Sequence, residues 1–182
     1  MKKIFMFLTI ILSLTGCSIG EDMSNTPTKQ VEEYLNNYQT LDSNVLASLD
    51  AIVNDEEMFD EDQKVTYRDI LKKHYQDLTY TVKEETVNGD SATVEVEIEV
   101  TDYTKAIKEA TDYRENNESK FVNENNEFDE VKFNTYKLEL LRDSKERVKY
   151  TIYFSLTKEN DKWKLNQLTE SEQEKILGIY EY

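Results

Sequence analysis

Residues 78–100 read LTYTVKEETVNGDSATVEVEIEV, and this stretch decides the fold that the sequence predicts. Apolar and polar side chains alternate on both sides of Asn88-Gly89. Alternation with a period of two is typical of strands with one buried face, and an Asn-Gly pair between two such runs signals a β-hairpin, because residues at the centre of the turn must accept positive φ. The second strand would bury an aliphatic face (Ala92, Val94, Val96, Ile98 and Val100) and turn Thr93, Glu95, Glu97 and Glu99 towards solvent.

A second alternating run, from Val148 to Leu156, predicts another antiparallel hairpin near the C-terminus. Its turn is expected at Glu159-Asn160-Asp161, after which Trp163 and Leu165 continue the apolar face on the return strand. The two hairpins together predict an antiparallel sheet of about four strands.

Three helices are predicted before the first strand. The first begins at Thr26-Pro27, the second is capped by Asp42 or Ser43, and the third starts at Asp60 with Gln63 three residues later. Apolar residues recur at helical spacing in all three. The inward faces comprise Val31, Tyr34, Leu35 and Tyr38, then Val45, Leu46, Leu49, Ile52 and Val53, then Tyr67, Ile70, Leu71, His74, Tyr75 and Leu78.

Residues 104–146, between the hairpins, are too long for a plain loop and should form a helical insertion. One helix is expected around Ala106 to Tyr113 and another around Phe133 to Leu141, with an exposed turn at 116–126. A short helix should close the chain, because Ser171-Glu172-Gln173-Glu174 reads as a capping box and Gly178 suits a helix C-terminus.

This order of elements predicts an α+β fold in which N-terminal helices pack on a curved antiparallel sheet. The order over Pro27 to Leu168, the hairpin at 87–94 and the strand start Lys162-Trp163-Lys164-Leu165 resemble the nuclear-transport-factor-2-like (NTF2-like, or cystatin-like) domains of small lipoproteins. The resemblance implies a cone-shaped pocket between helices and sheet, used for ligands, for homodimerisation through the sheet, or in a minority for catalysis. The insertion at 104–146 departs from the compact family pattern.

The N-terminus carries a secretory signal. Lys2 and Lys3 precede an apolar run that is too short to span a bilayer, and the run ends at Leu14-Thr15-Gly16-Cys17. That tetrad resembles the lipobox of bacterial lipoproteins, although an ordinary signal peptide with an incidental cysteine is the alternative. The resemblance implies cleavage between Gly16 and Cys17, removal of residues 1–16, and attachment of Cys17 to the bilayer by diacylglycerol and acyl chains such as palmitate. Residues 17–26 would then form a lipidated tether, and residues 27–182 a single domain.

The composition is acidic, with a formal net charge of −16. Removing Lys2 and Lys3 with the signal leaves 20 basic and 38 acidic residues, a charge of −18, which argues against nucleic acid as a partner. Cys17 is the sole cysteine, so thiolate zinc sites, cysteine nucleophiles and internal disulfides are excluded. The abundance of Asn, Lys, Glu and Ile suggests an AT-rich genome, and we expect a Gram-positive bacterium.

Candidate chemistry is sparse. His74 is the sole histidine and could act as a general base, but without a recognisable nucleophile or oxyanion motif it reads more simply as a half-buried helix residue. The acidic loop around residues 55–62 lacks the ligand order and glycine of an EF-hand, and residues 123–129 are equally unspecific. We therefore expect no metal and no cofactor.

Twelve tyrosines are the remaining feature. Aromatic residues with a polar group suit sugar, peptide or protein contacts, although more often they belong to the core. The candidate pocket residues are His74, Tyr80, Tyr103, Tyr150 and Trp163. The two resemblances imply a non-catalytic module on the extracytoplasmic face of the cell membrane, which binds a small ligand or an envelope protein of unknown identity. The alternative is an extracytoplasmic enzyme that uses His74.

Overall fold

The computed structural model describes residues 25–181, so the lipobox and most of the tether lie outside the described residues. Within that range the chain has the expected α+β architecture, with six α-helices and one open four-stranded antiparallel sheet. The elements are α1 (Pro27–Thr40), α2 (Ser43–Asp55), α3 (Glu61–Gln76), β1 (Thr79–Asn88), β2 (Ser91–Thr101), α4 (Thr104–Asn116), the 3-10 helix η1 (Glu118–Phe121), α5 (Glu130–Asp143), β3 (Arg147–Glu159), β4 (Lys162–Leu165) and α6 (Glu170–Leu177).

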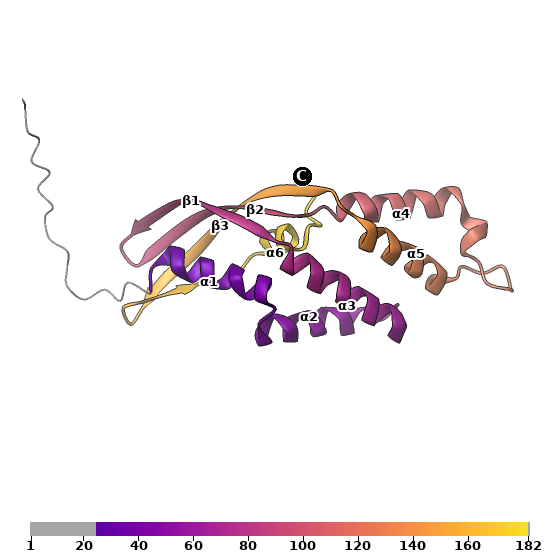
Figure 1. Ribbon diagram of the computed structural model, residues 1–182, viewed down its shortest axis with the longest axis horizontal. Helices are drawn as coiled ribbons and strands as arrows, with labels where there is room; N and C mark the ends of the chain where they lie inside the picture. The colour runs from indigo at the N-terminus through magenta and orange to yellow at the C-terminus, as the bar shows by residue number, and fades with distance from the viewer. Residues whose placement is uncertain (1–24, 182) are drawn as a thin grey trace, which may run out of the picture.

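The described body is elongated (Figure 1). The sheet occupies one part of it, and α4 and α5 form a helical hairpin that projects beyond one end of the sheet. The described chain begins near the opposite end, beside the turns of the two β-hairpins. The insertion predicted for residues 104–146 is therefore a separate arm, and it does not cover the sheet.

The strands follow the chain in the order β1-β2-β3-β4, all antiparallel. Residues that pair directly share a face of the sheet, and β2 and β3 pair Val94 with Phe154 and Val96 with Ile152. Both pairs are almost completely buried. The opposite face carries cross-strand ion pairs, in which Lys149 contacts Glu97 at 3.2 Å. A homodimer formed through that outer face would have to bury these charges.

The core lies between the aliphatic face of the sheet and the helices α1, α2, α3 and α6. Val31 and Leu35 of α1, Leu49 of α2 and Leu71 of α3 are buried there, as the helical spacing predicted. The predicted caps are also present. Thr26 accepts a hydrogen bond at the start of α1, Asp42 caps α2, and Asp60 with Gln63 forms the capping box of α3.

A β-bulge between Val82 and Glu84 changes which side chains of β1 face the helices. Beyond the bulge Glu85 pairs with Val94, so its carboxylate lies on the helical side of the sheet. There it accepts hydrogen bonds from the backbone N–H of Thr28 at 3.0 Å and from the Thr28 hydroxyl at 2.7 Å. A carboxylate at a helix N-terminus is favourable, so the bulge ties β1 to the first turn of α1.

The turn of the first hairpin differs from the expectation that Asn88 lies at its centre. Asn88 pairs with Ser91, so the two turn residues are Gly89 and Asp90, and Gly89 has a φ of 59°. Glycine at the first of two turn positions is the other favoured solution for a tight hairpin. In the second hairpin Asn160 and Asp161 both have positive φ, at 51° and 62°.

The segment expected to be an exposed turn, 116–126, holds part of a small core. The 3-10 helix buries Phe121 to 4% exposure between α4 and α5, where its ring meets that of Phe133 at 5.6 Å. The prediction of an exposed turn fails at Phe121, whereas the other residues of 116–126 are exposed or partly exposed. A single phenylalanine in a polar run gives no periodic pattern from which its burial could be predicted.

The C-terminal helix starts two residues earlier than predicted. Its capping box consists of Thr169 and Glu172, where the Thr169 N–H donates to the Glu172 carboxylate at 2.7 Å. The Ser171 box has the same residue pattern, but Thr169 follows Leu168, which packs against the core and fixes where the helix enters. Gly178 ends the helix with a φ of 69°, as expected of a C-cap glycine.

Candidate functional site

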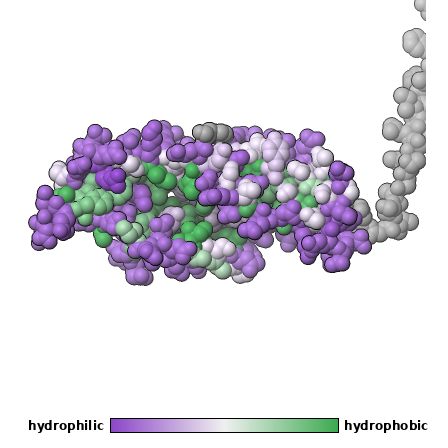
Figure 2. Space-filling model, turned by 180° about the vertical axis from the view of Figure 1, so that it is seen from behind, coloured by the Kyte–Doolittle hydropathy of each residue, from purple (hydrophilic) through white to green (hydrophobic). Residues whose placement is uncertain are grey.

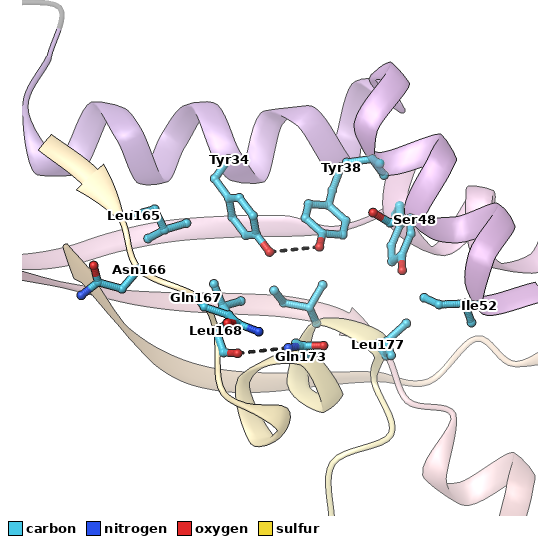
Figure 3. A pocket seen from close by; sticks show the side chains of 13 residues that line it. Tyr34, Tyr38, Ser48, Ile52, Leu165, Asn166, Gln167, Leu168, Gln173 and Leu177 are labelled. Atoms are coloured by element: carbon cyan, nitrogen blue, oxygen red, sulfur yellow. Dashed lines mark hydrogen bonds between the residues drawn. The ribbon is translucent and has the colours of Figure 1, made fainter. Parts of the chain in front are cut away.

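A cleft of about 470 Å³ lies between α1 and α2 on one side and α6 with its preceding segment on the other (Figure 3). Volumes of this size are typical of small-molecule sites. Figure 2 shows a hollow along the middle of one face, where hydrophobic residues are visible within a hydrophilic surface. The cleft is lined by Tyr34, Tyr38, Val45, Ser48, Ile52, Tyr75, Leu165, Asn166, Gln167, Leu168, Gln173, Ile176 and Leu177.

Three tyrosines form one wall of the cleft. Tyr34 and Tyr38 lie one turn apart on α1, with ring centroids 5.3 Å apart in an edge-to-face arrangement. Tyr38 in turn meets Tyr75 of α3 at 4.8 Å and 87°, and Tyr34 rests on Phe154 of the sheet. These contacts hold the rings in fixed orientations.

The hydroxyl groups of this wall are not all satisfied. The Tyr34 and Tyr38 oxygens share one hydrogen bond of 3.0 Å, which uses the hydrogen of one hydroxyl and leaves that of the other without a partner in the described range 25–181. Tyr75 is only 3% exposed, and its hydroxyl has no hydrogen-bond partner among residues 25–181. The wall therefore offers both donors and acceptors.

Amide side chains form the opposite rim. Gln173 donates through Nε2 to the Leu168 carbonyl at 3.0 Å, which closes the segment between β4 and α6 (Figure 3). Asn166 is held by Thr157 through a 3.1 Å hydrogen bond, whereas the exposed Gln167 amide has no partner within the described part of the chain.

None of the residues that line the cleft is charged. Burial raises the pKa of the Tyr34 and Tyr75 hydroxyls well above the usual value for tyrosine, so both stay protonated. The lining of the cleft therefore carries no formal charge of its own, within a chain of which 33% of the residues are charged.

The five predicted pocket residues do not line this cleft. His74 and Tyr103 come together, with ring centroids 4.8 Å apart, beside a second cavity of about 360 Å³. Trp163 and Tyr150 are buried in the core instead, where the Tyr150 hydroxyl donates to the Tyr180 carbonyl at 3.0 Å. Tyr80 lies on β1, where its hydroxyl donates to Asn36 at 3.0 Å.

His74 is fully enclosed, at 1% exposure, and not half-buried as predicted. Its Nε2 lies 2.8 Å from the Ile176 carbonyl, and burial lowers its pKa to about 4. The ring is therefore neutral at pH 7, and its Nε2–H donates to that carbonyl. The buried Nδ1 has no hydrogen-bond partner among residues 25–181. The imidazole thus ties α3 to α6.

The enzyme alternative required a carboxylate within hydrogen-bond distance of His74. Within residues 25–181 the ring's hydrogen bond goes to a backbone carbonyl, and no carboxylate bonds to it. The acidic loop before α3 likewise serves the helix, because Asp60 caps it. No group of three or more His, Cys, Asp or Glu side chains that could hold a metal ion is found in the described part of the chain.

The residues that sequence reasoning missed are Tyr34, Tyr38 and the amide rim. Helical spacing predicts both tyrosines on the buried face of the first helix, and in the structure they are partly buried, packed against the core and lining the cleft. A usable signal was their chemistry, since tyrosine twice in succession on an otherwise aliphatic helix face marks a boundary between core and solvent.

Comparison with known proteins identifies the N-terminus. Residues 1–18 match the family model of the prokaryotic membrane lipoprotein lipid attachment site, which supports a membrane-anchored bacterial lipoprotein. No helix between residues 25 and 181 has the length and hydropathy needed to cross a bilayer. No curated protein matches the chain.

A match among solved structures is the crystal structure of a candidate lipoprotein from Bacillus subtilis subsp. subtilis str. 168. The two chains are 15% identical, with a TM-score of 0.43, over 83% of this chain. The match spans 47% of the Bacillus chain, so this protein covers less than half the length of that one.

Proposed function

We propose that this chain is a lipid-anchored protein of the bacterial cell envelope whose domain, residues 27–182, is a non-catalytic module that binds an uncharged small ligand between α1, α2 and α6. The observation that carries the proposal is the neutral cleft of about 470 Å³, with its tyrosine wall and amide rim. A small ligand is favoured over a protein partner because the apolar and polar groups converge in a hollow and do not form a flat patch.

The proposed anchor is Cys17. The lipobox Leu14-Thr15-Gly16-Cys17 lies within the matched residues 1–18, so we place the cleavage after Gly16 and the tether at 17–26. Two acyl signals hold a protein stably on a bilayer, at roughly 0.8 kcal/mol per buried CH₂. The domain would then work on the extracytoplasmic face of the membrane, and from the composition we infer a Gram-positive cell.

The NTF2-like assignment is part of this proposal. Two features support this assignment. Three helices precede the two hairpins in the chain, and these helices pack on one face of the sheet that the hairpins form. The helical arm at 104–146 is the departure from the family pattern, and it contributes no residue to the lining of the cleft. The arm therefore does not close the mouth of the cleft.

Native mass spectrometry tests the proposal. The lipidated protein, extracted in mild detergent, is incubated with a soluble enzymatic digest of bacterial envelopes. We expect the wild type to gain a bound mass that Gln167→Trp loses, because an indole at this exposed and unpartnered position would fill the cleft mouth without disturbing the core. Tyr153→Trp is the matched control, since Tyr153 is 57% exposed on the outer face of the sheet. No bound mass, or equal binding by Gln167→Trp, contradicts the proposal.

A further inference from the structure

We infer that the ligand of this cleft is a neutral oligosaccharide built from N-acetylhexosamine units. The inference rests on the proposed function and names the chemical class that the cleft would take. It is argued from the charge, the hydroxyl groups, the ring packing and the amide groups of the lining residues.

The absence of charge in the lining selects against an ionic ligand. At the chain's composition of 33% charged residues, about four of thirteen residues would be charged, and none of those that line the cleft is. A carboxylate or ammonium group brought into such a cleft would lose water without gaining a counterion, which is costly. A ligand with no ionised group escapes that cost.

The hydroxyl groups suit a ligand that both donates and accepts hydrogen bonds. Tyr34 and Tyr38 share one hydrogen bond, so, as far as the described part of the chain is concerned, their pair keeps one hydrogen and several lone pairs for a ligand. The hydroxyl of Tyr75, which also lines the cleft, has no hydrogen-bond partner among the described residues. Sugar hydroxyls are donor and acceptor at once, and they can satisfy such a set, whereas an apolar ligand would leave it unpaired.

The tyrosine wall is ordered before a ligand arrives. Tyr38 is fixed between Tyr34 and Tyr75 by edge-to-face contacts at 5.3 Å and 4.8 Å, and Tyr34 lies against Phe154. A wall of fixed aromatic rings gives apolar contact to the C–H faces of a sugar with little loss of side-chain entropy on binding.

The amide rim indicates an acetamido sugar. Gln167 has no partner within residues 25–181, and Gln173 uses Nε2 on the Leu168 carbonyl, so its Oε1 is available. A side-chain amide presents a donor and an acceptor in one plane, which complements the N–H and C=O of an acetamido group. Apolar neighbours such as Leu165 and Leu177 can receive its methyl group.

Isothermal titration of the full lipidated protein in detergent micelles tests the inference with defined probes. We expect tri-N-acetylchitotriose to bind, and chitotriose, its cationic deacetylated form, to bind at least tenfold more weakly. Tyr34→Phe and Tyr38→Phe keep the rings and remove one hydroxyl each, and each should weaken binding roughly three- to tenfold. Tyr153→Phe, on the outer face of the sheet, should leave the affinity unchanged.

A charge placed in the rim gives a second measurement. Gln167→Glu changes an exposed side chain that has no partner in the described chain, so folding should be unaffected. The substitution should lower the affinity for the acetylated probe and raise the affinity for the cationic one. A preference for an uncharged capped tripeptide, no oligosaccharide binding, or equal affinities across these variants overturns the inference. If an envelope digest still yields the bound mass that Gln167→Trp loses, the proposed function survives that failure; if it does not, both fail.

Discussion

Gly178 lies at the C-terminal end of α6, next to Thr101 of β2 and His74 of α3. It ends α6 with positive φ, its carbonyl accepts from the Tyr103 N–H at 2.9 Å, and a Cβ at this position would lie 2.1 Å from the Thr101 carbonyl oxygen. The same Cβ would lie 3.1 Å from the His74 ring. Glycine is therefore required both by the backbone conformation and by the space.

The variant Gly178→Ala should separate these two requirements when it is compared with Gly89→Ala. Gly89 also has positive φ, but a Cβ there meets nothing within 4 Å. We expect Gly89→Ala to lower the free energy of unfolding by about 1 kcal/mol, and Gly178→Ala by at least about 3 kcal/mol. Urea unfolding of the two variants measures the difference, and equal losses would mean that the close approach to Thr101 is unimportant.

His74 should make folding sensitive to mild acid. Burial lowers its pKa to about 4, with Arg147 acting in the same direction and the Ile176 carbonyl and Asp77 opposing it. The unfolded chain, with an ordinary histidine pKa near 6.5, binds more protons between pH 6.5 and 4. Stability therefore falls as the pH falls through that window, by at most about 1.4 kcal/mol per pH unit and about 3 kcal/mol in all.

Unfolding of the wild type and of His74→Gln at a series of pH values measures this contribution. Glutamine can still donate to the Ile176 carbonyl but does not titrate. The carboxylates titrate in both proteins, so the difference between the two curves isolates the histidine. Parallel curves from pH 4 to 7 would contradict the burial of a neutral imidazole.

At the scale of elements, Gln63 joins the helical arm to the body. Its Oε1 accepts from the Asp60 N–H in the capping box of α3, while its Nε2 donates to the Val131 carbonyl at 2.8 Å and to Thr135 at 3.0 Å. The same 5% exposed side chain therefore caps one helix and holds α5 against it. The capping role was predictable from the spacing, and the contact with α5 was not.

Gln63→Glu should loosen the arm while it keeps the cap. The carboxylate can still accept from Asp60, but it places an acceptor against the Val131 carbonyl. We expect a loss of about 2 kcal/mol and faster amide exchange in α4 and α5, with the sheet unchanged. Asp60→Ala, which removes the cap alone, should cost about 1 kcal/mol without that change in α5. Hydrogen exchange followed by mass spectrometry distinguishes the two.

The order of the elements was predictable because each has a local signature. Period-two alternation marked β2 and β3, helical spacing marked α1 to α5, and caps marked the starts of α1, α2 and α3. What could not be predicted depends on contacts between distant residues. The bulge that turns Glu85 towards Thr28, the burial of Phe121 and the choice of Thr169 over Ser171 all follow from packing against other elements.

At the scale of the whole molecule, the candidate site was harder to predict than the fold. The cleft exists because α6 folds back towards α1 and α2, which brings residues near 34 and 173 together across the whole chain. Alternation and helical spacing predict which faces are buried, but they do not predict which buried faces border a cavity. Trp163 illustrates this, since alternation placed it correctly on the inner face and the inner face is filled.

The proposed anchoring of the whole protein through Cys17 is tested by a single substitution. We expect Cys17→Ala to leave unprocessed precursor and to abolish metabolic labelling with a fatty acid, because lipid attachment precedes cleavage at a lipobox. Ser18→Ala is a control that keeps the cysteine. Gel fluorography measures the labelling. If the Cys17→Ala protein is labelled as strongly as the wild type, Cys17 is not the site of lipid attachment.

The pairing of Asn25 with Trp163 has a mechanical consequence. The Asn25 side chain accepts a hydrogen bond from the Trp163 N–H at 2.5 Å and donates one to the Trp163 carbonyl at 3.4 Å. A force applied through the proposed N-terminal anchor would therefore act first on this pair and then on the first turn of α1. An unwinding helix gains about 2 Å per residue, since its rise of 1.5 Å becomes about 3.5 Å. Unwinding α1 from Pro27 to Tyr34 would lengthen the tether by about 16 Å and withdraw Tyr34 from the cleft. With the proposed anchor and ligand, tension on the tether and a ligand in the cleft would oppose each other: a filled cleft would stiffen the attachment, and a stretched one would release its ligand.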